Sequence, residues 1–254
     1  MPDRTSVDAT NLGRVLPLLL VAKAQDRLPS PMSTVQYQRH LAATGQHLVG
    51  WIEGPPAAAR AVFVAICPPD DTAIVMIPPP GSRGIDRAAQ ETLTKVGLDA
   101  LAQRKIRYAQ ALLDPDDIER QRLLDRVGFR KLTDLHYLER PLEPIDRVEP
   151  ASGIVWRSYS PATHGDFARV VQRSYEDSAD CPELAGLRPI DAVLEAHKAA
   201  GPFDPALWQL ALRDGEPAGC ILLSRAASAC AEIVYVGVTP QQRGRRLGHA
   251  LVQH

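Results

Sequence analysis

The sequence predicts an α+β protein in α/β/α layers, with a mixed, mostly antiparallel sheet, and with two such domains in tandem. Its 254 residues are enough for two domains of ordinary size. Short apolar, β-branched runs alternate with amphipathic helical segments. The same order of elements begins again after a proline-rich segment. We place the first domain at residues 1–143, the linker at 144–152 and the second domain at 153–254.

The first domain is predicted to begin with two helices and three strands. Apolar residues at helical spacing mark the helices, and turns rich in proline and glycine separate the strands. A helix, a strand, a second helix and a last strand complete the domain. In chain order the expected elements are helices at 11–25 and 33–44, strands at 47–52, 59–67 and 72–77, a helix at 87–104, a strand at 106–113, a helix at 118–127 and a strand at 132–138.

The second domain is predicted to repeat this order. Its first strand alternates apolar and polar residues, and a hairpin turn at 213–216 joins its second and third strands. The expected elements are a strand at 154–159, helices at 161–175 and 190–200, strands at 207–212, 218–223 and 233–238, and a helix that begins near Leu247.

An arginine- and glycine-rich turn lies between the last predicted strand and the last predicted helix. Backbone N–H groups at a helix N-terminus lack intrahelical acceptors and favour anions, and three guanidinium groups flank them. The sequence therefore predicts a pyrophosphate site in this turn. Its residues are Arg243, Gly244, Arg245, Arg246, Leu247 and Gly248.

This turn resembles the signature of the GNAT superfamily of acetyl-CoA-dependent N-acetyltransferases, Arg/Gln-x-x-Gly-x-Gly/Ala after a strand. Arg243 and Gly248 match its first and last positions, and Arg246 stands where the middle glycine is expected. The resemblance implies that acetyl-CoA places its pyrophosphate on the turn and that an amine accepts the acetyl group. It also implies that Glu232 is the general base. The pantetheine arm would lie along Val236, Gly237 and Val238.

The first domain is similar to the same family in its order of elements, but its site residues differ. Leu124 stands where the family has a tyrosine acid, and prolines without N–H groups occupy the turn before residue 84. A second cofactor site is the weaker interpretation, and a structural domain that kept the fold is the stronger one.

The tandem layout is similar to that of mycothiol synthase-like acetyltransferases. The chain stops at His254, so the second domain is expected to be incomplete and to leave the motif strand with an unpaired edge. Three explanations stay open. The chain is a truncated gene product, another chain completes the domain (a homodimer included), or the first domain covers the edge. The alternative to an active enzyme is an inactive acyl-CoA-binding or structural module.

Composition limits the partners. The 29 Lys and Arg residues nearly balance the 30 Asp and Glu residues, which gives no global charge for binding nucleic acid or an anionic membrane. The cysteines at positions 67, 181, 220 and 230 show no CxxC pair, which favours free thiols over a metal site or disulfides. We expect a cytoplasmic protein that acts on a small molecule or protein amine without a metal.

Overall fold

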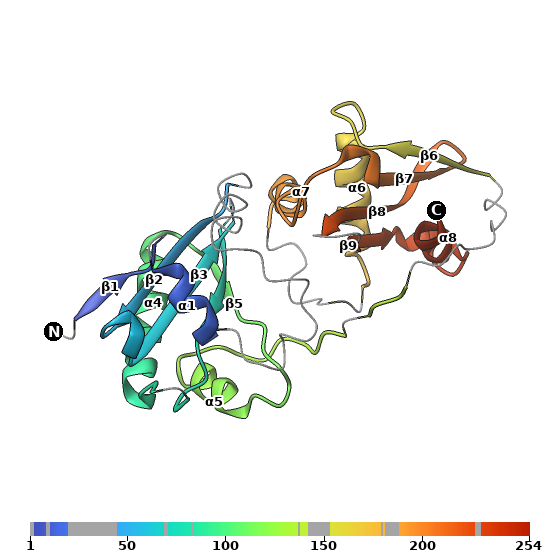
Figure 1. Cartoon of the computed structure of the whole chain (residues 1–254). Coiled ribbons are helices and arrows are strands. Elements are labelled where there is room, and N and C mark those ends of the chain that lie inside the picture. The colour runs from blue at the N-terminus through green and yellow to red at the C-terminus, as the bar shows by residue number, and fades with distance from the viewer. Residues whose placement is uncertain are drawn as a thin grey trace. The chain divides into compact units, whose positions relative to one another are not determined.

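The computed structural model describes residues 3–8, 11–19, 45–68, 71–82, 84–136, 138–141, 153–178, 180, 188–226 and 230–254. The chain divides into two compact units, Met1–Lys131 and Leu132–His254. Each unit has one sheet with helices on both faces, so the predicted α+β class is confirmed (Figure 1). No helix in these described parts has the length and apolarity needed to cross a membrane.

The N-terminal unit has a five-stranded sheet in the order β1-β2-β3-β4-β5. The first four strands pair antiparallel, and β5 runs parallel to β4, with Thr72 opposite Tyr108. The sequence interpretation missed β1, because this strand is short and polar and shows no apolar alternation. The strands are β1 (Arg4–Ser6), β2 (His47–Glu53), β3 (Ala61–Cys67), β4 (Thr72–Met76) and β5 (Tyr108–Gln110).

Helices cover both faces of this sheet because β3 is apolar on both sides. Phe63 and Ala65 pack in the cluster that contains α4, whereas Val62 and Val64 pack with α1. A Cβ atom at Gly97 would lie 2.5 Å from the Phe63 ring, so glycine allows α4 to approach the sheet closely. The helices are α1 (Leu12–Leu19), the 3-10 turn η1 (Pro56–Ala58), α4 (Arg87–Gln103) and α5 (Ile118–Arg126).

The strand predicted at residues 132–138 is wrong. None of the described residues in 131–141 forms a strand, and Leu132, Leu135 and Leu138 are 44%, 58% and 92% exposed. The three leucines are spaced by three residues, so a strand would not place them on one face. The predicted helix at 33–44 and the predicted linker at 144–152 lie outside the described residues.

The C-terminal unit has a four-stranded antiparallel sheet in the order β6-β7-β8-β9. A β-bulge interrupts the last pair: Leu222 lies opposite Tyr235 and Leu223 opposite Ile233, which leaves Val234 as the extra residue. The strands are β6 (Ile154–Ser158), β7 (Trp208–Arg213), β8 (Glu216–Ala226) and β9 (Cys230–Val238).

Helices α6 and α7 cover one face of this sheet and pack on Trp208, Leu210 and Leu222, whereas α8 covers the other face (Figure 1). The ring of His254 stacks on Trp156 at a centroid distance of 3.9 Å. The helices are α6 (His164–Ser174), α7 (Ile190–Lys198), the 3-10 turns η3 (Pro205–Leu207) and η4 (Pro240–Gln242), and α8 (Leu247–Gln253).

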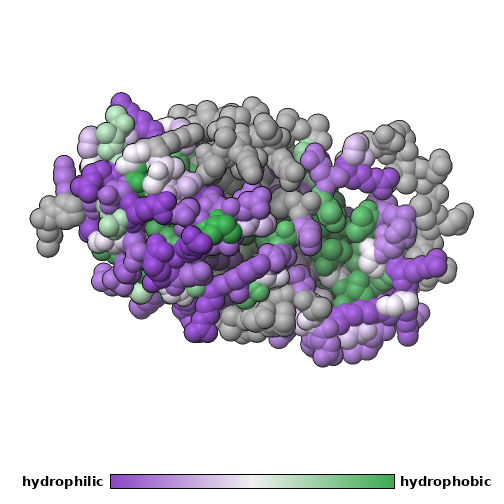
Figure 2. Space-filling view, turned by 90° about the horizontal axis from the view of Figure 1, so that it is seen from below, coloured by the Kyte–Doolittle hydropathy of each residue, from purple (hydrophilic) through white to green (hydrophobic). Residues whose placement is uncertain are grey.

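Strand β9 is an edge strand, because no described strand pairs with its outer side. Ile233 and Val236 on this strand are 45% and 42% exposed. Figure 2 shows hydrophobic residues gathered on the side of the C-terminal unit that faces the viewer. Among the described residues, the backbone N–H and C=O groups along the outer side of β9 therefore have no strand partner.

Candidate functional site

The candidate site is the connection between β9 and α8. Thr239 holds the end of the strand, since its N–H and its hydroxyl group both donate to the carbonyl oxygen of Ala218, at 3.0 and 3.1 Å. Residues 240–242 form η4, and α8 begins at Leu247. A largely open cavity of about 410 Å³ lies at this connection, within the range of small-molecule sites. The turn cavity is lined by Val238, Gln242, Arg243, Gly244, Arg246, Leu247 and Gly248.

Most of the predicted cofactor residues lie on the turn cavity, and the others lie beside it. Arg245 is exposed in the same turn, and Val236 is exposed on β9. Gly237 is buried, and a Cβ atom there would lie 2.8 Å from the Ser174 hydroxyl oxygen. Sequence reasoning missed Gln242 because it precedes the recognised pattern.

Arg246, at the position of the expected glycine, has a backbone conformation that glycine adopts readily. Its φ of 60° and ψ of 14° are left-handed, a conformation that costs a non-glycine residue about 1–2 kcal/mol. Gly244 also has a positive φ, 72°, and no atom lies within 4 Å of the position of an added Cβ. The departure from the motif therefore places a side chain at a position whose backbone conformation favours glycine.

The guanidinium group of Arg243 is already engaged. It donates to the carbonyl oxygens of Ser174, Glu176 and Asp177 at 2.9, 2.8 and 3.1 Å. These carbonyls belong to the C-terminal end of α6 and the residues after it. The last carbonyl groups of a helix receive no hydrogen bond from its own backbone N–H groups, and a cation there interacts favourably with the helix dipole.

Arg245 and Arg246 differ from Arg243 in this respect. Both side chains are exposed, and neither has a hydrogen bond or ion pair with another described residue. The first N–H groups of α8 also lack intrahelical acceptors, as at any helix start. The rim of the turn cavity is therefore positive and rich in donors, which suits a diphosphate group.

Glu232, the predicted base, lies on the same strand as the turn cavity but far from it. An extended strand places it about 20 Å from Val238. Glu232 is exposed and stands directly opposite Ser224 on β8, and no described residue forms a hydrogen bond or ion pair with its carboxylate. No described side chain therefore competes with a bound molecule for this carboxylate.

Tyr235 joins this strand to the helices behind it. Its hydroxyl group forms a hydrogen bond with that of Ser174, and its ring lies 5.3 Å from the ring of His197. Burial raises the pKa of Tyr235, with a smaller opposing effect of the Ser174 hydrogen bond. Burial, assisted by the charge of Arg188, lowers the pKa of His197 to about 4. Both groups are neutral near pH 7, so they anchor β9 without adding charge. The sequence offered no local signal for this contact.

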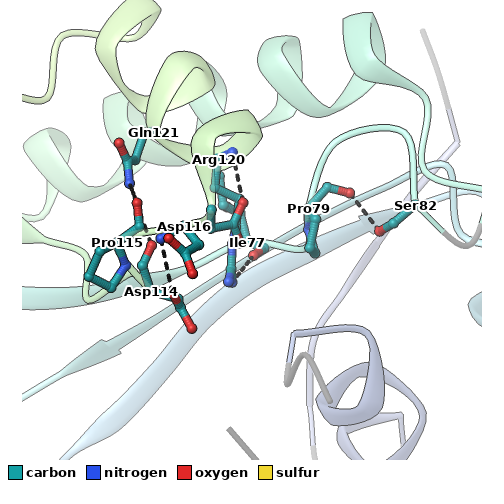
Figure 3. Close-up of polar contacts among 9 residues, drawn as sticks. Ile77, Pro79, Ser82, Asp114, Pro115, Asp116, Arg120 and Gln121 are labelled. Atoms are coloured by element: carbon teal, nitrogen blue, oxygen red, sulfur yellow. Dashed lines mark hydrogen bonds and ion pairs between the residues drawn. The ribbon is translucent and has the colours of Figure 1, made fainter. Parts of the chain in front are cut away.

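In the N-terminal unit, side chains of the unit itself contact the two ends of the corresponding turn. The carboxylate of Asp86 caps α4 by accepting from the N–H of Ala89 at 2.7 Å, so a negative charge already lies at that helix start. Figure 3 shows Arg120 donating to the carbonyl oxygen of Ile77 at 3.3 Å. Arg120 also pairs with the carboxylate of Asp117 at 2.5 Å, and both side chains are largely buried.

Comparison with known proteins agrees with this geometry. The model of the acetyltransferase (GNAT) family matches residues 172–254, which include β9, the turn and α8. Mycothiol acetyltransferases from Streptomyces griseus and Streptomyces coelicolor are 34% and 33% identical over 128 residues, 49% of this chain. The chain spans only 40% of the length of each of these relatives.

Two solved structures share the fold over nearly the whole chain. A GCN5-related N-acetyltransferase from Sphaerobacter thermophilus has a TM-score of 0.66 at 19% identity, covering 99% of this chain and 80% of its own. A tandem GNAT protein from the clavulanic acid biosynthesis pathway has a TM-score of 0.53 at 16% identity, covering 100% and 84%. At such identities the likeness concerns the fold. The segment at the candidate site is therefore similar to the GNAT acetyltransferase family, and the fold of the chain is similar to that of a tandem GNAT protein.

Proposed function

We propose that the C-terminal unit binds acetyl-CoA at the turn cavity and transfers the acetyl group to an amine. The observation that carries this proposal is the turn cavity itself, which lies inside the family-matched segment and is lined by Arg246, whose guanidinium group has no hydrogen bond or ion pair with another described residue. The amine class of the acceptor follows the family resemblance and agrees with the N-acetyltransferase name of the Sphaerobacter protein. Whether that amine belongs to a small molecule or a protein stays open.

The described residues fit acetyl-CoA at both ends of the site. The N–H groups of the turn and of the first turn of α8, with Arg245 and Arg246, would hold the diphosphate. The backbone of Val236, Gly237 and Val238, on the edge strand β9, would hold the pantetheine arm by strand-like hydrogen bonds. Acetyl-CoA supplies the activated acetyl group, and Glu232 would remove a proton from the amine, directly or through water. In the part of the chain that the structure describes, no cluster of metal-ligating side chains is present.

Replacing Glu232 with Gln tests the proposed base. We expect kcat to fall by about 10²–10⁴, because Gln has the same shape but cannot accept the proton. The affinity for acetyl-CoA should not change, because Glu232 lies far from the turn cavity. The measurement is release of CoA from acetyl-CoA in the presence of a panel of primary amines.

Asp214→Asn is the matched control for this substitution. Asp214 is an exposed carboxylate in the β7–β8 hairpin, and Asn tolerates its positive φ of 54°. An unchanged kcat in Glu232→Gln would exclude the base role. Saturable acetyl-CoA binding without CoA release from any amine would instead favour an acyl-CoA-binding module.

We also propose that the N-terminal unit is structural and that each chain binds a single acetyl-CoA. The Asp86 carboxylate at the start of α4 would repel a diphosphate, and Arg120 already occupies the carbonyl group at the end of β4. Calorimetric titration of the full chain should therefore give a stoichiometry of one. A stoichiometry of two, with the second site unaffected by substitutions in the turn at 243–248, would contradict this assignment.

A further inference from the structure

Arg243 is the motif residue whose side chain makes the most contacts. Its guanidinium donates to three carbonyl groups, those of Ser174, Glu176 and Asp177, and all three distances lie between 2.8 and 3.1 Å. These bonds occupy both terminal nitrogens of the guanidinium. A diphosphate would therefore have to compete with three existing hydrogen bonds for this group.

Two further contacts join the same end of α6 to the motif. Arg173 donates to the side-chain oxygen of Gln241 in η4, and the Ser174 hydroxyl group bonds that of Tyr235 on β9. The last turn of α6 is thus bound to the strand, to η4 and to the turn. Arg245 and Arg246 have no such contacts with described residues.

We infer that Arg243 is a positioning residue that couples the turn cavity to the C-terminal end of α6, and that Arg245 and Arg246 supply the charge for the anion. This inference rests on the proposed binding of acetyl-CoA. It has two consequences. Loss of Arg243 should loosen the end of α6 even without ligand, and it should not remove the electrostatic part of the binding. Ligand binding at the turn should in turn stabilise the end of α6 through Arg243, because coupling between two sites is reciprocal.

The experiment compares Arg243→Gln with Arg245→Gln, which remove the same charge from the same turn. Hydrogen exchange is followed at the amides of residues 175–178, with and without acetyl-CoA. Those of Tyr175, Glu176 and Ser178 donate to backbone carbonyls and are therefore suitable reporters. The affinity for acetyl-CoA is measured at low and at high ionic strength, because salt screens an exposed charge but leaves a geometric effect unchanged.

In Arg245→Gln we expect about twofold to fivefold weaker binding at low ionic strength, a reduced salt dependence, and wild-type exchange at 175–178. In Arg243→Gln we expect faster exchange at these amides without ligand, wild-type salt dependence, and no further protection when acetyl-CoA binds. Arg243→Lys should restore part of the protection, since an ammonium group can still donate to the carbonyls.

The inference is overturned if Arg243→Gln reduces the salt dependence as Arg245→Gln does, because Arg243 would then contact the anion itself. Unchanged exchange at 175–178 in the ligand-free Arg243→Gln protein would overturn it as well. Failure of the wild-type protein to bind acetyl-CoA would refute the proposed function, whereas the ligand-free exchange would still decide whether Arg243 holds the end of α6.

Discussion

Acetyl-CoA binding should weaken by about 30- to 1000-fold when Gly244 is replaced by Glu. The new carboxylate would stand on the wall of the turn cavity, close to the position proposed for the diphosphate. Repulsion between charges about 4–5 Å apart at a protein surface amounts to about 2–4 kcal/mol, which corresponds to this change in Kd. Isothermal titration calorimetry on the full chain measures the effect, which should shrink as ionic strength rises.

Gly244→Ala separates the charge from the backbone in this experiment. Gly244 has a φ of 72°, so any side chain there is strained, and Ala should cost about 1 kcal/mol of stability. An added Cβ meets no atom within 4 Å, so Ala introduces no clash. The Ala variant should therefore bind acetyl-CoA nearly as well as the wild type. Equal losses of acetyl-CoA affinity in the Glu and Ala variants would show that binding depends on the conformation of the turn alone. Wild-type affinity in both variants would show that the diphosphate does not bind at this turn.

Replacing Leu247 with Ala should lower the free energy of unfolding of the C-terminal unit by about 2–5 kcal/mol. Leu247 is only 1% exposed and packs with Leu251, Ala211 and Ile221 between α8 and the sheet. The substitution leaves a cavity directly beneath the first turn of α8. Since the unit has two of the three tryptophans, Trp156 and Trp208, fluorescence during chemical denaturation follows its unfolding.

Val252→Ala is the matched control, because Val252 lies on the same helix and is 56% exposed. Its effect on stability should be within about 0.5 kcal/mol. The comparison also tests how Leu247 contributes to the site. Leu247→Ala can lose affinity for acetyl-CoA in two ways. If cooling or a stabilising osmolyte restores the affinity, Leu247 acts by stabilising the fold of α8. If the loss persists, Leu247 contacts the ligand directly.

Local patterns predicted the elements that carry a strong apolar signal. The strands around Phe63 and Leu210 and the helix at α4 follow the expected ranges closely, because the two strands are short apolar runs bounded by turn residues and the buried residues of α4 recur at helical spacing. Strand β1 escaped prediction because its polar residues are ordered by pairing with β2 instead of by burial. The opposite error was made at Leu132, Leu135 and Leu138. These apolar residues lack the two-residue period of a strand, but the segment was predicted to be a strand.

The candidate site shows the same limit. The turn at 243–248 could be recognised because its chemistry lies in consecutive residues. The engagement of Arg243 by Ser174 and Glu176 depends on the packing of α6 against β9, and nothing in the residues around position 243 reports it. In the N-terminal unit, the prolines before residue 84 predicted a turn poor in N–H donors, whereas Asp86 and Arg120 act through contacts that only the fold creates.

The extra residue in β9 decides on which side of the sheet Glu232 stands. Strict alternation from Tyr235 would place residue 232 on the face covered by α8. Because Val234 is inserted, Glu232 lies opposite Ser224 and shares the face of Leu222, which α6 and α7 cover. A deletion of one codon at position 234 would remove the bulge and keep Glu232 opposite Ser224, whereas a regular ladder that retains Val234 would place the carboxylate on the other face. For related chains, the pairing register of this strand is therefore as informative about the proposed base as the presence of the glutamate.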